Sequence, residues 1–260
     1  MKKIKLLMLS VGMLAAHSAL AETTTMRYGL EAEYPPFESK TADGKLVGFD
    51  IELGNAICRE AQLKCSWVES AFDTLIPALQ AKKFDVINSA MNITAQRAKA
   101  IDFTNPIYQV PTQLIARKDA ALEPTATSLR GKNIGVLQGS IQEVYAKKHW
   151  QPKGVTITSY KDQNQVYNDL ANGRLDGTLV MSTAGQSGFL DKPQGKDFGF
   201  AGKPVTDDKV LGIGIGFGLR KGDDQLRERI NKAIKQVQQD GTIHQLSQKY
   251  FKGFDVSLNQ

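Results

Sequence analysis

Arg97 and the residues just before it form the first candidate site for ligand chemistry. Thr94 stands three residues earlier and is a good N-cap residue, so the spacing predicts a helix that begins there. The free N–H groups of a helix start and the forked guanidinium of an arginine both bind carboxylates. The segment therefore predicts a carboxylate site. The alternative is an ordinary capped helix with an arginine on its surface.

A second helix start is predicted in Gly139-Ser140-Ile141-Gln142-Glu143. Ser140 and Glu143 have the spacing of a capping box. The segment follows an expected strand over Ile134–Leu137, and ligands of open α/β sheets bind beyond the carboxyl ends of strands. If both helix starts face one cleft, a single small anion could bridge them. The alternative is capping for stability alone.

Two aromatic residues and one acid suggest a place for a cationic group. Tyr34 precedes Pro35-Pro36, Phe72 precedes Asp73, and Glu31 lies three residues before Tyr34. Two rings and a carboxylate would hold a cation by stacking and charge pairing. For each ring, the alternative is burial in the core.

Patterns typical of catalysis are missing from the sequence. After residue 21 the chain keeps two histidines, His149 and His244, neither of them in a metal-binding motif, and it has no G-x-S-x-G motif. The alternation of glycines from Gly212 to Gly218 predicts a closely packed strand, since it matches neither common phosphate-binding motif. The sequence favours a binding protein over an enzyme, with no metal and no cofactor.

The elements that would position these residues alternate between strands and helices. Strands are predicted over Met26–Leu30, Lys64–Val68, Phe84–Asn88 and 131–137, and helices over 49–61, 75–81, 223–239 and 243–251. This alternation predicts an α/β fold with mostly parallel sheets.

A weak internal repeat suggests that the fold has two similar halves. Leu79-Gln-Ala-Lys-Lys-Phe-Asp85 and Leu170-Ala-Asn-Gly-Arg-Leu-Asp176 place a leucine, a basic residue, an apolar residue and an aspartate at the same offsets. Both segments end a predicted helix and lead into a strand. Two α/β lobes explain the repeat, and chance similarity of two turns is the alternative.

Residues 1–21 have the pattern of a secretory signal peptide. Lysines near the N-terminus precede an apolar stretch from Leu6 to Ala16 and a final Ala19-Leu20-Ala21. Cleavage would remove three lysines, so the formal charge of +6 becomes +3, from 30 basic and 27 acidic residues. Because this charge is small and no basic run remains, nucleic-acid binding is not expected.

The sequence has two cysteines, Cys58 and Cys65. Export places them in an oxidising compartment, which favours a disulfide between them. Free or metal-binding thiols are the alternative, but no histidine or third cysteine lies nearby to complete a metal site.

Several short motifs are specific only when they are taken together. They are Glu31-Ala-Glu-Tyr-Pro-Pro-Phe37, Gly48-Phe-Asp-Ile51, Cys58 with Cys65, Phe72-Asp-Thr-Leu-Ile-Pro77, Asn92-Ile-Thr94 with Arg97, Leu137-Gln-Gly139, Gly173-Arg-Leu-Asp176, Asp240-Gly-Thr242 and Lys249-Tyr-Phe251. With them the chain resembles the solute-binding proteins (family 3) of polar amino-acid ABC transporters. The similarity covers nearly all of residues 26–254 and is greatest to the periplasmic lysine/arginine/ornithine- and histidine-binding branch.

The resemblance implies a fold and a function. Two α/β lobes would be joined by two hinge strands, with the ligand in the cleft between them. Lobe one would comprise residues 22–109 and 212–258, and lobe two residues 112–208. The protein would be a periplasmic monomer, not an enzyme, that closes over a cationic amino acid and delivers it to a membrane permease.

The resemblance also implies a role for individual residues. Tyr34 and Phe72 match rings that flank the ligand side chain, Glu31 matches the acid that meets its cationic end, and Arg97 matches the arginine that holds its carboxylate. The remaining matches are Ser89, Ala90 and Asn92 at a strand end of lobe one, and Ser140, Ile141 and Gln142 at the helix start of lobe two.

Three positions depart from the family pattern. Met181 stands where the family usually has an aspartate for the ligand's α-ammonium group, Asn92 replaces a hydroxyl residue, and Ile141 replaces a common threonine. An opine-like, N-substituted arginine derivative is therefore an alternative ligand. A second alternative ligand is arginine whose ammonium group is held by other polar groups, such as Asn92 or Ser182. For the function, a periplasmic enzyme similar to cyclohexadienyl dehydratase is a less favoured alternative.

Overall fold

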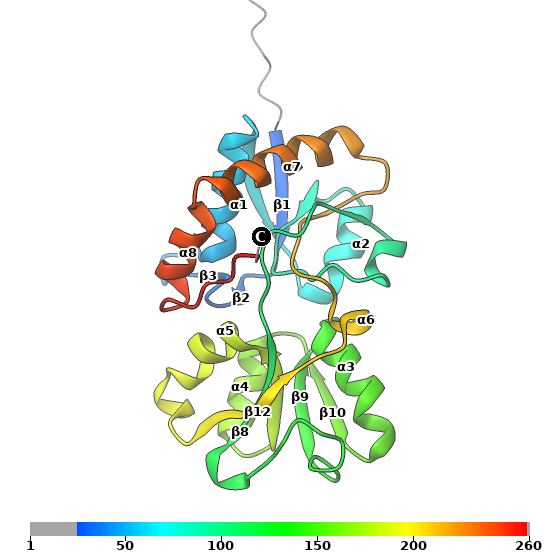
Figure 1. Cartoon of the computed structure of the whole chain (residues 1–260), viewed down its shortest axis with the longest axis vertical. Helices are drawn as coiled ribbons and strands as arrows, with labels where there is room; N and C mark the ends of the chain where they lie inside the picture. Colours follow the sequence, from blue (N-terminus) through cyan, green and yellow to red (C-terminus); the bar gives the residue numbers. More distant parts are fainter. Residues whose placement is uncertain (1–24, 259–260) are drawn as a thin grey trace, which may run out of the picture.

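The computed structural model describes residues 25–258 and consists of two lobes, one above the other in Figure 1. Each lobe contains a five-stranded sheet with helices packed against it. The expected two-lobe α/β fold is confirmed. The predicted signal peptide, residues 1–21, lies outside the described residues.

Lobe one, the upper lobe in Figure 1, is built on a sheet of order β5-β1-β6-β13-β7. A small second sheet joins β2, β3 and β4. The bounds of the strands are β1 (Thr25–Leu30), β2 (Glu33–Tyr34), β3 (Glu38–Lys40), β4 (Leu46–Val47), β5 (Lys64–Glu69), β6 (Val86–Ile87), β7 (Asp102–Phe103) and β13 (Gly218–Leu219).

The helices of lobe one lie on two sides of its large sheet. They are α1 (Phe49–Glu60), α2 (Leu75–Gln80), α7 (Asp224–Gln239) and α8 (Thr242–Tyr250). Helices α1, α7 and α8 pack together, whereas α2 joins a separate apolar cluster. The buried side chains of α7, Ile230, Ile234 and Val237, recur at helical spacing, which explains why one face of this helix covers α1.

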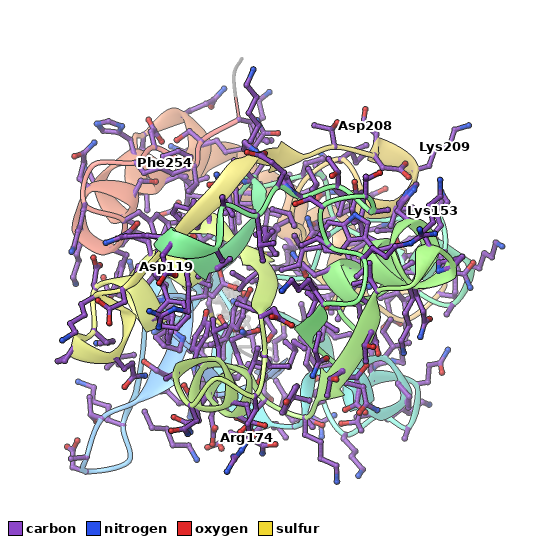
Figure 2. The ribbon with its side chains drawn as sticks, turned by 90° about the horizontal axis from the view of Figure 1, so that it is seen from below. Asp119, Lys153, Arg174, Asp208, Lys209 and Phe254 are labelled. Atoms are coloured by element: carbon purple, nitrogen blue, oxygen red, sulfur yellow. A yellow bond between two sulfur atoms is a disulfide. The ribbon has the colours of Figure 1, made fainter. Side chains whose placement is uncertain are left out.

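Lobe two contains a sheet of order β10-β9-β11-β8-β12. Its elements are β8 (Thr112–Arg117), β9 (Asn133–Leu137), α3 (Ile141–His149), β10 (Thr156–Tyr160), α4 (Gln163–Ala171), β11 (Gly177–Met181), α5 (Ser182–Gly185) and β12 (Phe198–Val205), followed by α6 (Asp208–Leu211) near the hinge. Figure 2 views this lobe from its outer end, where the exposed Asp119, Lys153 and Arg174 carry charges of both signs.

The internal repeat of the sequence corresponds to a repeated structural feature. Asp85 accepts a hydrogen bond from the backbone N of Arg27 in β1, at 3.0 Å. Asp176 accepts one from the backbone N of Asn133 in β9, at 2.8 Å. Since β1 and β9 hold the same place in the strand orders of the two sheets, each aspartate fixes the start of an equivalent strand.

The expectation of mostly parallel sheets was wrong. In each five-stranded sheet two strand pairs are parallel and two are antiparallel. The antiparallel strands adjoin the two segments that pass between the lobes, residues 104–111 and 206–217 (Figure 1). A chain that crosses to the other lobe and returns runs in opposite directions, so its sheet partners cannot all be parallel.

The strand predicted over Gly212–Gly218 is also wrong for most of its length. Only Gly218 lies in a strand, β13, while Ile215 forms isolated bridges with Asn92 and Tyr108. Gly212 and Gly214 have positive φ angles of 82° and 127°, which interrupt extended pairing. The glycine run is part of the hinge, and its bridges tie the hinge to lobe one.

Cys58, in α1, and Cys65, in β5, form the disulfide that was expected. Within residues 25–258 no helix is long and apolar enough to cross a membrane. The same residues contain no group of three or more histidines, cysteines or acids arranged to hold a metal ion.

Candidate ligand-binding site

Both lobes present the carboxyl edge of their sheet to the cleft. In lobe one β1 and β6 are parallel neighbours, so Glu31 and Ser89, which follow them, lie at the same edge. In lobe two β9 and β11 are parallel neighbours, which end at Leu137 and Met181. This edge is where open α/β sheets bind ligands.

A single cavity between the lobes is lined by ten of the eleven residues predicted to bind a ligand. Its lining consists of Tyr34, Phe72, Ser89, Ala90, Asn92 and Arg97 from lobe one and Leu137, Ser140, Ile141, Gln142 and Met181 from lobe two. Sequence reasoning missed Leu137 as a lining residue, although its place at the end of a strand was a usable signal. That these residues bind a ligand stays a prediction.

The helix predicted to begin at Thr94 is not formed. The Thr94 hydroxyl does accept a hydrogen bond from the backbone N of Arg97, but a short 3₁₀ turn, Arg97–Lys99, follows. A turn of three residues has no sizeable dipole. The carboxylate chemistry of lobe one therefore depends on the Arg97 side chain rather than on a helix terminus.

The guanidinium of Arg97 is held by neutral partners at the cavity. It donates to the backbone oxygen of Asn92 at 2.8 Å and to that of Gly139, in lobe two, at 3.1 Å. It also lies 5.5 Å from the centre of the Phe72 ring. Burial lowers the pKa of Arg97 to about 10, so the group stays charged at neutral pH. Within residues 25–258 it forms no ion pair with a carboxylate, which leaves a cation available for an anionic ligand.

Two buried acids, which sequence reasoning missed, hold the strand end of lobe one in place. Glu38 accepts a hydrogen bond from the Ser89 hydroxyl at 2.6 Å. Asp50 accepts hydrogen bonds from the backbone N of Ala90 and from the Tyr108 hydroxyl, both at 2.6 Å. Burial raises the pKa of both carboxyls, that of Asp50 to about 6. Asp50 interrupts an apolar stretch of the sequence, between Phe49 and Ile51, which was an available signal.

Ala90 adopts an unusual backbone conformation at this strand end. Its φ angle is +43°, in the left-handed region that non-glycine residues seldom occupy. The hydrogen bond to Asp50 fixes this conformation. The acids therefore shape one wall of the cavity without lining it.

Glu31 is the predicted site residue that does not line the cavity. Its backbone N donates to the Ser89 hydroxyl at 3.0 Å, and its side chain is only 5% exposed. Neither carboxylate oxygen has a hydrogen-bond partner among the described residues. Burial, with smaller contributions from Asp162, Glu33 and Asp73, raises its pKa to about 8. A buried acid without a partner is costly, and a ligand cation would satisfy it.

The wall contributed by lobe two combines a capped helix with apolar side chains. Ser140 caps α3 by accepting a hydrogen bond from the backbone N of Glu143, as the capping box predicted. The Glu143 carboxylate accepts from the backbone N of Gly139 rather than from that of Ser140. Gln142 donates to the Thr112 hydroxyl at 3.0 Å. Beside these groups lie Ile141 and Met181, 5% and 4% exposed.

Polar contacts join the two lobes. Gln138 donates to Asp73 at 2.9 Å, and Asn164 donates to Glu33 at 3.3 Å. Away from the cavity, Lys252 pairs with Asp191 at 2.8 Å. The structure is therefore that of a closed cleft.

Comparison with known proteins assigns the chain to a family. The model of the bacterial extracellular solute-binding proteins, family 3, matches residues 26–253. The chain belongs to this family.

Two curated relatives and one solved structure show how similar its members are. The lysine/arginine/ornithine-binding periplasmic protein of Escherichia coli is 49% identical, with 96% of each chain covered. The histidine-binding periplasmic protein of Salmonella typhimurium is 45% identical over 93% of this chain and 92% of the relative. A periplasmic binding protein of Salmonella typhimurium described for its high arginine specificity has a TM-score of 0.81 at 32% identity, covering 88% of this chain and all of that one.

Proposed function

We propose that the chain is the periplasmic substrate-binding component of an ABC importer for a cationic amino acid of the arginine, lysine, ornithine and histidine class. The observation that carries the proposal is the guanidinium of Arg97, which borders a cavity between two lobes and pairs with no carboxylate within residues 25–258. The relatives in this family, which are named as binding such amino acids, support it.

In this proposal each end of the ligand meets a different group. The ligand carboxylate accepts hydrogen bonds from Arg97, and the start of α3 at Ser140 approaches it from the other lobe. Tyr34 and Phe72 flank the ligand side chain, and Glu31 supplies the negative charge for its cationic end. Ser89, Ala90 and Asn92 complete the wall of lobe one, and Ile141, Gln142 and Met181 that of lobe two.

Closure of the lobes would couple ligand binding to delivery. We expect residues 22–109 with 212–258 to move as one body and residues 112–208 as the other, with the hinge in the two crossing segments. A ligand that contacts both lobes stabilises the closed form by its differential affinity for the two forms. A monomer with closed lobes, exported by the peptide at residues 1–21, would then be recognised by the membrane permease.

The proposed role is binding without chemical change. A dehydratase of this fold would need a positioned acid facing its substrate, and the lobe-two wall offers the thioether of Met181 at this place. We expect prephenate and arogenate to be recovered unchanged after incubation with the protein. Formation of a new product would support the enzyme alternative.

A panel of ligands tests the proposed function. The mature chain is unfolded and refolded to remove carried ligand, and thermal shifts are then recorded with arginine, lysine, ornithine, histidine, glutamine, octopine, nopaline and prephenate. A ligand present at 100 times its Kd adds about 2.7 kcal/mol of stability. We expect a shift of several degrees with at least one cationic amino acid or cationic derivative. Absence of a shift with every cationic member would contradict the proposal.

A further inference from the structure

Two ionisable side chains, one basic and one acidic, are available to a ligand at the closed cavity. Of its eleven lining residues, Arg97 is the only one whose side chain is charged at neutral pH. Glu31 is the acid that touches this wall, through the bond between its backbone N and Ser89, and both of its oxygens lack a partner among the described residues. The site therefore offers a ligand one cation, Arg97, and one acid, Glu31, without a hydrogen-bond partner in residues 25–258.

The other acids near the cavity already have partners. Glu38 accepts from Ser89, and Asp50 accepts from Ala90 and Tyr108, so both lie behind the strand end. Asp73 accepts from Gln138, across the lobes. These groups are not placed to receive a second positive charge on the ligand.

An α-ammonium group would have poor surroundings in this cavity. In an α-amino acid it lies next to the carboxylate, and so close to the charge of Arg97, which repels it. The lining side chains of Ala90, Ile141 and Met181 offer no acceptor stronger than the weak thioether sulfur of Met181. The Ser89 hydroxyl is already used by Glu31 and Glu38. What remains is neutral, chiefly the side-chain amides of Asn92 and Gln142.

We propose that the preferred ligand is a carboxylic acid with its cationic group at the far end of an alkyl chain and no charged ammonium on its α-carbon. 5-Guanidinopentanoate and 6-aminohexanoate are the simplest members of this class. Such a molecule places one negative charge on Arg97 and one positive charge near Glu31, and its α-carbon packs against Ile141 and Met181. The inference rests on the proposed function, because it assigns the same cavity and the same two charged ends.

The charges of the cavity lining limit which groups this ligand can carry. An opine adds a second carboxylate and further carbon atoms to arginine, and the cavity lining offers no second arginine or lysine for that carboxylate. The small deaminated acids are therefore favoured over opines.

Matched pairs of ligands test the inference by calorimetry on the refolded mature chain. The pairs are L-arginine with 5-guanidinopentanoate and L-lysine with 6-aminohexanoate, which differ only in the α-ammonium group. Because the cavity gives the α-ammonium no charged partner in place of the water that it loses, we expect the deaminated member to bind about tenfold or more tighter. Tighter binding of the L-amino acids, or of octopine, would overturn the inference and leave the proposed function standing. Absence of binding by all of them would overturn both.

Variants at position 181 show whether Met181 causes the preference. Met181→Asp adds a carboxylate beside the ligand's α-carbon, and we expect it to shift the ratio of the two affinities toward L-arginine by about tenfold or more. Met181→Asn is the matched control, of similar size and without the charge, and it should shift the ratio far less. An equal effect of the two variants on both ligands of a pair would contradict the placement of the α-carbon beside Met181.

Discussion

Arg97 is the residue on which the account depends most. Its guanidinium is fixed by the backbone oxygens of Asn92, in lobe one, and Gly139, in lobe two. We expect the contact to Gly139 to break when the lobes open. A ligand carboxylate would add the negative charge that these neutral partners do not supply.

Replacement of Arg97 tests this role. We expect Arg97→Ala to weaken binding by about a hundredfold or more, because the buried carboxylate of the ligand loses its charged partner. Arg97→Lys is the matched control, which keeps the charge, loses the fork and should retain part of the affinity. Calorimetry measures both, with circular dichroism to verify folding. Near-normal affinity of Arg97→Ala would refute the site.

Glu31 makes ligand binding dependent on pH. Burial raises its pKa to about 8, so at lower pH the empty site holds a proton that a cationic ligand must displace. We therefore expect the affinity for a cationic ligand to rise between about pH 6 and pH 8, and to level off above that. Glu31→Gln should remove this rise and weaken binding at pH 8 by about tenfold or more.

The same group affects the stability of the ligand-free protein in the opposite direction. The folded state holds a proton that the unfolded chain, with the ordinary value of 4.5, has already released. Its contribution to stability is therefore fully present below about pH 4.5 and is lost as the pH rises through about 8. Urea unfolding of the wild type and of Glu31→Gln between about pH 4.5 and pH 8 measures how the free energy of unfolding of each depends on pH. Equal pH dependence in the two proteins would contradict the raised pKa of Glu31.

At the scale of elements, the N-terminus of α3 contributes both to the stability of the fold and to the candidate site. Ser140 caps this helix and also lines the cavity. We expect Ser140→Ala to lower the free energy of unfolding by about 1 kcal/mol, because the N–H of Glu143 loses its acceptor. Ser140→Thr retains the hydroxyl and serves as the control. An unchanged urea midpoint for Ser140→Ala would show that the cap contributes nothing measurable.

The elements with strong local patterns were predictable from the sequence. The periodic apolar residues of α7 and the capping box of α3 specify helices by themselves. Helix α7 lies within a residue of its expected bounds, and α3 begins at the predicted cap, Ser140. The segments at Thr94 and Gly212 were mispredicted for one reason. Their conformation is set by contacts with distant residues, such as the bridges of Ile215 to Asn92 and Tyr108.

The residues of the candidate site also fall into those that local motifs predicted and those that depend on distant contacts. Motif matches selected ten residues that the fold brings together at one cavity. Glu38 and Asp50 escaped notice because their importance arises from burial beside Ser89 and Ala90, which lie far away in the sequence. Local spacing cannot show that two acids will share one buried environment.

At the scale of the whole molecule, the two similar lobes form one functional unit. Each lobe alone offers half of a cavity, with the charged groups on lobe one and the apolar wall on lobe two. Contacts such as that between Lys252 and Asp191 join the lobes away from the cavity. Closure therefore brings together groups that neither lobe could present by itself.

A crystal structure of the refolded chain with its tightest ligand from the panel tests the central claim most directly. The account predicts one ligand molecule between closed lobes, with its carboxylate hydrogen-bonded to Arg97 and its cationic end beside Glu31. A ligand bound outside this cavity, or bound in it with its charged ends reversed, would contradict the account.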